Sequence, residues 1–176
     1  MIKKIKASRS EKIIFFFLIS LAIFSLSSFF LIKNKCLFVK NYNPEKLSFD
    51  KPNNIAILNV ECGNVIIELY PNISPNSVER FKTLVRSKAY DDVAFHRVIK
   101  DSLVQAGDLE FGKKGNIDYG KIGTGQSGLG TINSEVDVPF NYERGSVGLA
   151  RTQKYNTEDS QFFIILKDEP LYESEY

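Results

Sequence analysis

Residues Tyr90 to Asp108 read YDDVAFHRVIKDSLVQAGD and contain His96, the single histidine of the chain. From Phe95 to Ile99 the side chains alternate in character, which is typical of a half-buried β-strand. The alternation places Arg97 on the same face as Phe95, with His96 on the other. Because a guanidinium is costly to bury without a partner or a ligand, Arg97 is the first candidate for a functional residue.

Length and composition bound the possible functions. The chain has 176 residues, enough for one domain with its own core. One histidine and two cysteines, Cys36 and Cys62, form no metal or redox motif, which excludes most zinc and catalytic-triad chemistry. The spacing of the cysteines leaves open whether they pair or remain free thiols.

Charge is distributed unevenly along the chain. Residues 1–40 carry eight Lys or Arg against Glu11 alone, a net charge of +7, whereas the whole chain carries +2. The remainder therefore carries −5. A mildly acidic domain has no basic field to attract phosphates, so we expect no nucleic-acid partner.

The N-terminal part predicts a membrane anchor. A basic flank, residues 1–12, precedes twenty uncharged residues at positions 13–32, which as a helix would span the roughly 30 Å hydrocarbon core of a bilayer. The alternative is a cleaved signal peptide, but the run is longer than usual and no small-residue cleavage site follows. The basic flank favours a cytoplasmic N-terminus, with the domain on the exported, periplasmic or lumenal, side. Residues 33–54 read as a polar linker.

The domain begins with a predicted hairpin and helix. Residues 55–60 and 65–70 are rich in β-forming residues and are separated by a short turn, which indicates a β-hairpin. Ser74-Pro75 then predicts the start of a helix, with serine at the N-cap. Apolar residues recur there at helical spacing and predict a buried face: Val78, Phe81, Leu84 and Val85.

A glycine-rich segment, residues 112–130, contains Gly123-x-Gly125-x-x-Gly128. This spacing can mark a phosphate-binding loop, but no apolar strand precedes it and no helical pattern follows. We therefore interpret it as a surface loop. Residues 145–150 and 161–166 predict two further strands.

Four motifs resemble the cyclophilin-type peptidyl-prolyl cis–trans isomerases in order and spacing, over residues 55–176. They are YDDVAFHRVI, QAGD at residues 105–108, GSVGLAR at residues 145–151 and SQFFI at residues 160–164. The resemblance implies a mainly β fold, a closed antiparallel β-barrel with capping helices, without metal or organic cofactor. Relatives continue beyond Tyr176 with further strands and a helix, so we expect a fragment of a longer protein whose barrel is incomplete at its C-terminus.

The resemblance also implies roles for individual residues. Arg97 matches the catalytic arginine, and Gln105 matches the polar residue that holds it and contacts the substrate. The remaining positions are expected to bind substrate: Leu103 and Phe163 as walls of the proline pocket, Ala150 and Arg151 as the strand edge beside the substrate backbone, and Tyr172 where relatives have a small apolar residue.

The resulting hypothesis is a membrane-anchored, monomeric isomerase that acts on X-Pro bonds of polypeptides and assists protein folding. A different class of function, a module that binds proline-containing segments without turning them over, remains open. Two features favour it: the pocket left incomplete at the C-terminus, and Lys100-Asp101-Ser102, which stands where the family commonly has Pro-Gly-Phe. Ser102 therefore replaces an aromatic wall of the expected pocket.

Overall fold

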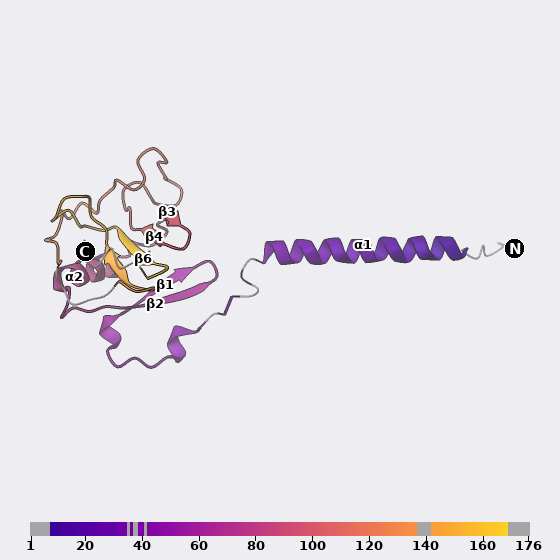
Figure 1. Ribbon diagram of the computed structural model, residues 1–176, viewed down its shortest axis with the longest axis horizontal. Coiled ribbons are helices and arrows are strands. Elements are labelled where there is room, and N and C mark those ends of the chain that lie inside the picture. Colours follow the sequence, from indigo (N-terminus) through magenta and orange to yellow (C-terminus); the bar gives the residue numbers. More distant parts are fainter. Residues whose placement is uncertain (1–7, 35, 37–38, 41, 137–141, 169–176) are drawn as a thin grey trace. The chain divides into compact units, whose positions relative to one another are not determined.

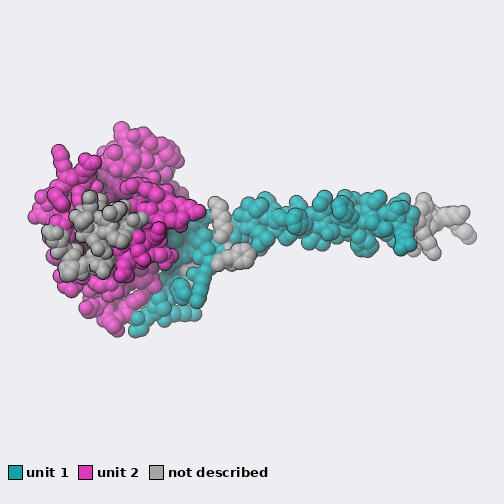
Figure 2. Space-filling view, in the orientation of Figure 1, with its two compact units in different colours: residues 1–48, 57–65 teal, residues 49–56, 66–176 magenta. Residues whose placement is uncertain are grey.

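The computed structural model describes residues 8–34, 36, 39–40, 42–136 and 142–168. Two compact units are distinguished, residues 1–48 with 57–65 and residues 49–56 with 66–176 (Figure 2). The elements follow in this order (Figure 1): α1 (Arg9–Lys33), two 3₁₀ turns (Pro44–Lys46 and Pro52–Asn54), β1 (Ile55–Val60), β2 (Gly63–Glu68), α2 (Pro75–Arg86), β3 (Arg97–Ile99), β4 (Leu103–Ala106), β5 (Val147–Leu149) and β6 (Phe162–Ile165).

Helix α1 contains the uncharged stretch predicted to be helical. Its start is defined by a capping box, in which the Ser8 hydroxyl accepts the N–H of Glu11 at 3.2 Å and the Glu11 carboxylate accepts the N–H of Ser8 at 2.7 Å. None of its side chains is buried. The helix is long and apolar enough to cross a membrane, a property that a signal sequence shares.

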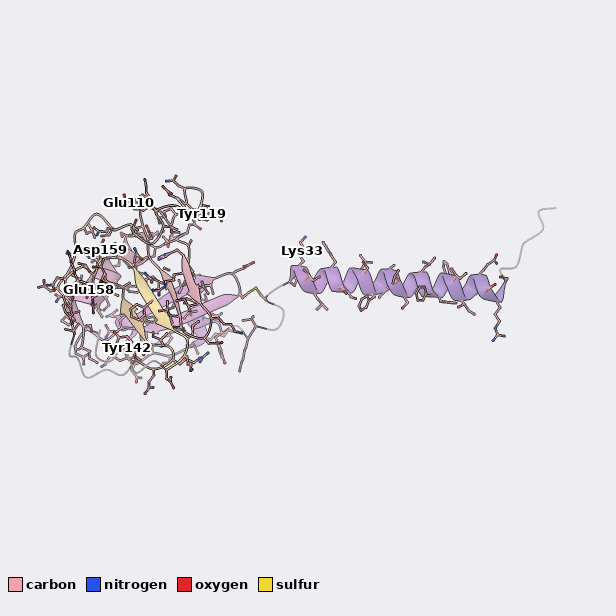
Figure 3. All side chains as sticks on the ribbon, turned by 45° about the horizontal axis from the view of Figure 1, so that its top comes forward. Lys33, Glu110, Tyr119, Tyr142, Glu158 and Asp159 are labelled. Atoms are coloured by element: carbon pink, nitrogen blue, oxygen red, sulfur yellow. A yellow bond between two sulfur atoms is a disulfide. The ribbon has the colours of Figure 1, made fainter. Side chains whose placement is uncertain are left out.

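A disulfide joins Cys36 to Cys62, with their Cα atoms 4.9 Å apart (Figure 3). The two cysteines are therefore paired and are not free thiols, a choice that their spacing left open. Cys36 follows the end of α1 by three residues, and Cys62 lies in the turn between β1 and β2. The polar linker is therefore closed into a covalent loop.

Strands β1 and β2 form the predicted hairpin as a two-stranded sheet. Strand β1 has the predicted bounds. Strand β2 begins two residues earlier than expected, because Gly63 adopts a φ of 146° and leads directly out of the turn into the strand. Ile67 is the buried residue of this hairpin.

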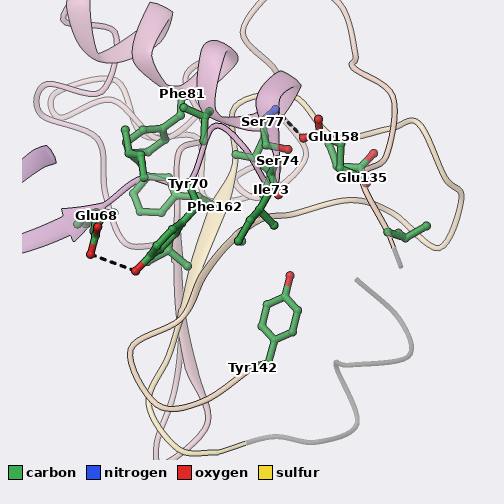
Figure 4. A pocket seen from close by; sticks show the side chains of 17 residues that line it. Glu68, Tyr70, Ile73, Ser74, Ser77, Phe81, Glu135, Tyr142, Glu158 and Phe162 are labelled. Carbon is green, nitrogen blue, oxygen red and sulfur yellow. Dashed lines mark hydrogen bonds between the residues drawn. The ribbon is translucent and has the colours of Figure 1, made fainter. Parts of the chain in front are cut away.

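Helix α2 begins at Pro75 as predicted, but its N-terminus is capped from a distance. Ser74 occupies the N-cap position and its side chain makes no capping hydrogen bond. Instead, the Glu135 carboxylate accepts the N–H groups of Asn76 at 2.7 Å and Ser77 at 2.9 Å. Figure 4 shows Ser77 and Glu135. A carboxylate at this position satisfies free N–H groups and complements the helix dipole.

The core of the domain lies between α2 and the larger sheet. Three residues of the predicted apolar face are buried, at Val78, Phe81 and Leu84, whereas Val85 is 41% exposed and was wrongly included. The rings of Phe81, Tyr90 and Phe162 lie 5.3 to 5.5 Å apart, centroid to centroid. Phe162 meets the other two rings edge to face, and contacts of this kind add to the free energy gained by burial.

The larger sheet is antiparallel, with the strand order β3-β4-β6-β5. Within the described part of the chain the two sheets remain separate and do not close into the barrel that the resemblance implied. The physical reason is that β3 and β5 each have a paired strand on one side only, and closure requires a partner for both edges.

Candidate active site

One row of residues crosses all four strands of the larger sheet. The register pairs Arg97 with Gln105, Gln105 with Phe163, and Phe163 with Gly148. Residues directly opposite one another in antiparallel strands project to the same face. The predicted catalytic arginine, its polar partner and a predicted pocket residue therefore share one face of the sheet.

The two predicted catalytic residues are in contact. Arg97 is exposed, and its Nη1 donates to the Gln105 side-chain oxygen at 3.3 Å. They are brought together by the tight turn between β3 and β4, in which Asp101 takes a positive φ of 56° and Ser102 donates its N–H to Ile99 at 3.1 Å. Aspartate is among the residues that tolerate this conformation.

Leu103 and Phe163 are buried in this structure, each 3% exposed, and form a cluster with Ile165. The Tyr142 ring stacks on Phe163 with centroids 6.1 Å apart. A Cβ at Gly148 would lie 2.7 Å from the Phe163 ring, so the glycine makes room for the aromatic side chain. Both side chains lie on the Gln105 face, and their role as walls of a proline pocket stays a prediction.

Ala150 and Arg151 follow the end of β5, at the edge of the sheet. The N–H of Ala150 donates to the Gln161 carbonyl at 2.7 Å, so this donor is used within the sheet. The Arg151 side chain is held by the Thr152 carbonyl at 2.9 Å and by the Tyr155 ring, 4.6 Å away. Tyr172, the remaining predicted substrate-binding residue, lies outside the described residues.

His96 precedes β3 and is half-buried, with its ring beside Gly123. Burial lowers the pKa of His96 below its ordinary value, although the carboxylate of Asp108 acts in the opposite direction. We therefore expect a neutral imidazole at neutral pH, which fits a structural role.

Asp108 is fully buried and accepts four backbone hydrogen bonds. One carboxylate oxygen accepts the N–H groups of Glu110 at 3.2 Å and Phe111 at 2.8 Å; the other accepts those of Gly123 at 2.6 Å and Gly125 at 3.0 Å. The glycine spacing that resembled a phosphate loop thus binds an anion from the chain itself. A Cβ at Gly125 would overlap this carboxylate, which explains the glycine.

Acid is expected to destabilise the fold through Asp108. Burial alone would raise its pKa, but the N–H donors outweigh burial, and the pKa of folded Asp108 lies below its ordinary value of 3.8. The unfolded chain then binds a proton more tightly than the folded protein. The stabilisation is complete above about pH 4 and is lost as the pH falls through the lowered pKa.

Urea unfolding of the full chain between about pH 7 and pH 2 measures this effect. Asp108→Asn is expected to show a shallower loss of unfolding free energy in acid than the unsubstituted chain. Asp118→Asn, which removes a carboxylate that is 44% exposed, serves as the control. An identical acid response in Asp108→Asn and the unsubstituted chain would contradict the prediction.

Gln161 is a site residue that the sequence analysis did not identify. Its side-chain oxygen accepts from Gln105 at 2.9 Å, and its nitrogen donates to the carbonyls of Gly123 and Gly125, both at 3.0 Å. The sequence feature that could have identified Gln161 is its position in the SQFFI motif, two residues before the predicted pocket residue Phe163.

Among the hollows lined by described residues of the second unit, two bear on the site. One, of about 250 Å³, lies beside Gln105 and Gln161 and reaches the predicted strand edge at Ala150 and Arg151. The other, of about 120 Å³, lies between α2 and the sheet (Figure 4), and none of the predicted site residues lines it. The first hollow therefore brings Gln105 together with Ala150 and Arg151, whereas Arg97, Leu103 and Phe163 do not line it.

Comparison with known families identifies this arrangement. A family model described as "Cyclophilin type peptidyl-prolyl cis-trans isomerase/CLD" matches residues 55–176, more than half of the chain. The chain belongs to the cyclophilin family. The family predicted from the four motifs is therefore confirmed.

Curated cyclophilin relatives are named as isomerases. A probable peptidyl-prolyl cis-trans isomerase of Brucella suis is 43% identical over 128 residues, which cover 71% of this chain and 64% of that protein. A peptidyl-prolyl cis-trans isomerase of Streptomyces antibioticus is 34% identical over 111 residues, 63% of this chain and 61% of that protein. The chain thus spans just under two thirds of the length of these relatives.

Solved cyclophilin structures share the fold. A Cryptosporidium parvum cyclophilin, crystallised in the presence of the dipeptide Ala-Pro, matches with a TM-score of 0.53 and 27% identity over 62% of this chain and 65% of that chain. A cyclophilin of Hirschia baltica matches with a TM-score of 0.57 over 76% of this chain and 67% of that one. At 22% identity, the second match bears on the fold alone.

Proposed function

We propose that this chain is a peptidyl-prolyl cis–trans isomerase that acts on X-Pro bonds of polypeptides and assists protein folding. The observation that carries the proposal is the hydrogen bond between Arg97 and Gln105 on the sheet face that also bears Phe163. The names of the curated relatives, and the Ala-Pro dipeptide present with a related structure, support a proline-containing substrate.

The chemistry of the reaction suits an arginine. Rotation about a peptide bond has a barrier of about 18–20 kcal/mol because the nitrogen shares its lone pair with the carbonyl. In the twisted transition state the proline nitrogen becomes pyramidal and regains that lone pair. A guanidinium N–H donated to this nitrogen binds the twisted form better than the planar form, which accelerates rotation.

The surrounding residues complete the proposed site. Gln105 holds the Arg97 guanidinium, Leu103 and Phe163 are the apolar walls for the proline ring, and the chain at Ala150–Arg151 lies beside the substrate backbone. Tyr172 is a further substrate-binding position. The rotation transfers no proton and forms no covalent intermediate, so the proposal needs no cofactor.

The proposal includes anchoring by α1 in a membrane. It divides the chain into a flank (1–12), an anchor (13–32), a linker (33–54) and a monomeric isomerase domain (55–176). The length and exposed apolar surface of α1 support the anchor. A disulfide between Cys36 and Cys62 is typical of an oxidising compartment. It favours an N-terminus in the cytoplasm and the domain on the exported side.

The test is the rate of cis–trans exchange at an X-Pro bond in a short peptide. The 176-residue chain, in detergent micelles, is expected to accelerate this exchange, whereas detergent alone should not. Peptide binding without acceleration would instead select the non-catalytic module. Ser102, which is half-buried where relatives have an aromatic residue, is the observation that favours this second candidate.

A further inference from the structure

A continuous path of hydrogen bonds leads from the buried Asp108 carboxylate to the proposed catalytic arginine. Its first link is the pair of N–H groups of Gly123 and Gly125 on one carboxylate oxygen, at 2.6 and 3.0 Å. The carbonyls of the same two glycines accept from Gln161 Nε2, both at 3.0 Å. The N–H groups of the glycine loop therefore bind the Asp108 carboxylate, and its carbonyls bind the side-chain amide of Gln161.

The second half of the path fixes the direction of two amide groups. Gln161 Nε2 donates to two carbonyls, so its oxygen must face Gln105 and accept from Gln105 Nε2 at 2.9 Å. That contact in turn leaves the Gln105 oxygen to accept from Arg97 Nη1 at 3.3 Å. If the side-chain amide of Gln161 or Gln105 were turned by 180°, donor would face donor or acceptor would face acceptor. The Gln105 oxygen could then no longer accept from the Arg97 guanidinium.

We propose that Asp108 and Gln161 are positioning residues for Arg97, acting through the Gly123–Gly125 loop and the side chain of Gln105. This inference rests on the proposed isomerase activity of the same site. Neither residue touches the Arg97 guanidinium directly in the hydrogen bonds described. Arg97 is exposed, and its side chain would otherwise adopt many rotamers, so a fixed acceptor at Gln105 aims it where the proline nitrogen would lie.

The charge on Asp108 matters because the glycine N–H groups must be held firmly. Charge-assisted hydrogen bonds are roughly twice as strong as neutral ones. A neutral side chain at this position would also bring amide hydrogens against backbone N–H groups. The loop would then shift, and the two carbonyls that orient Gln161 would shift with it.

The test combines kinetics with a spectroscopic signal from the site. Gln161→Met keeps the size of the side chain and removes its three hydrogen bonds, to Gln105 and to the carbonyls of Gly123 and Gly125. It is expected to lower kcat about tenfold and to leave KM within about twofold, as the loss of an interaction made in the transition state would. Gln153→Met, at an exposed glutamine outside the site, is the matched control and should behave as the unsubstituted chain.

The second readout is the side-chain amide signal of Gln105 in the NMR spectrum of the full chain in micelles, assigned by its loss in Gln105→Glu. This signal should move in Gln161→Met and in Asp108→Asn, although Asp108 lies three hydrogen bonds away. Asp108→Glu, which keeps the charge and displaces the carboxylate, serves if Asp108→Asn does not fold.

An unchanged kcat in Gln161→Met, or an unmoved Gln105 signal in a folded Asp108 variant, overturns the inference. Failure of the proposed function is a separate result, because the unsubstituted chain would then be inactive. In that case the Gln105 signal still decides whether Asp108 and Gln161 position the amide.

Discussion

Arg97→Ala is expected to lower kcat/KM for X-Pro isomerisation about 100- to 1000-fold. This is the loss found when one donor to a developing negative centre is removed from an active site. Arg97→Lys should recover little of the activity, because an ammonium lacks the planar fork of donors that can bond Gln105 and the proline nitrogen together. The measurement is cis–trans exchange of a proline peptide, with the peptide concentration varied to separate kcat from KM.

The control for this prediction is the stability of the variant. Arg97 is exposed, so its truncation should change the free energy of unfolding by no more than about 0.5 kcal/mol. A folded Arg97→Ala chain that isomerises at the unsubstituted rate would remove the arginine from the mechanism.

Arg80→Met is expected to lower the free energy of unfolding by about 3–5 kcal/mol, because it leaves a buried carboxylate without its cation. Arg80 extends from α2 to Asp159, whose side chain is 4% exposed, and also donates to the carbonyl of Gly130 at 2.6 Å. Asp159 additionally accepts from the backbone and side chain of Ser127. The measurement is urea unfolding of the full chain at neutral pH.

The same helix offers a matched control. Arg86 lies 3.9 Å from Glu79, and both side chains are about 70% exposed, at 70% and 71%. Arg86→Met should therefore change the unfolding free energy by less than about 1 kcal/mol. If Arg80→Met and Arg86→Met lowered the free energy of unfolding equally, burial of the Arg80–Asp159 pair would not determine its contribution to stability.

The elements that could be predicted from the sequence are those with a strong local signal. The hairpin from Ile55, the helix from Pro75 and the strand at Phe162 follow from periodicity and turn residues, and the structure has each of them. The contact between Arg97 and Gln105 was implied by the family resemblance, and the antiparallel pairing of β3 and β4 places the two residues opposite each other.

Contacts between distant segments could not be predicted in this way. The Glu135 cap of α2 joins residues 59 positions apart, and the Gln105–Gln161 contact joins residues 56 apart. No local pattern marks either. The glycine spacing at Gly123 and Gly125 did carry information. The anion that the loop binds is Asp108, which lies earlier in the chain in the QAGD motif, and no local pattern marks it as the partner of that loop.

The disulfide limits how far the β1–β2 hairpin can move from the end of α1. From Lys33 to Cys36 the chain can extend about 10 Å, and the bond itself joins Cα atoms 4.9 Å apart, so the turn of the β1–β2 hairpin stays close to the end of α1. Without the bond, the linker from Lys33 to Ile55 could extend to about 75 Å. With α1 in a bilayer, the oxidised bond would hold the β1–β2 turn near the membrane surface, and reduction would release the turn from the helix end.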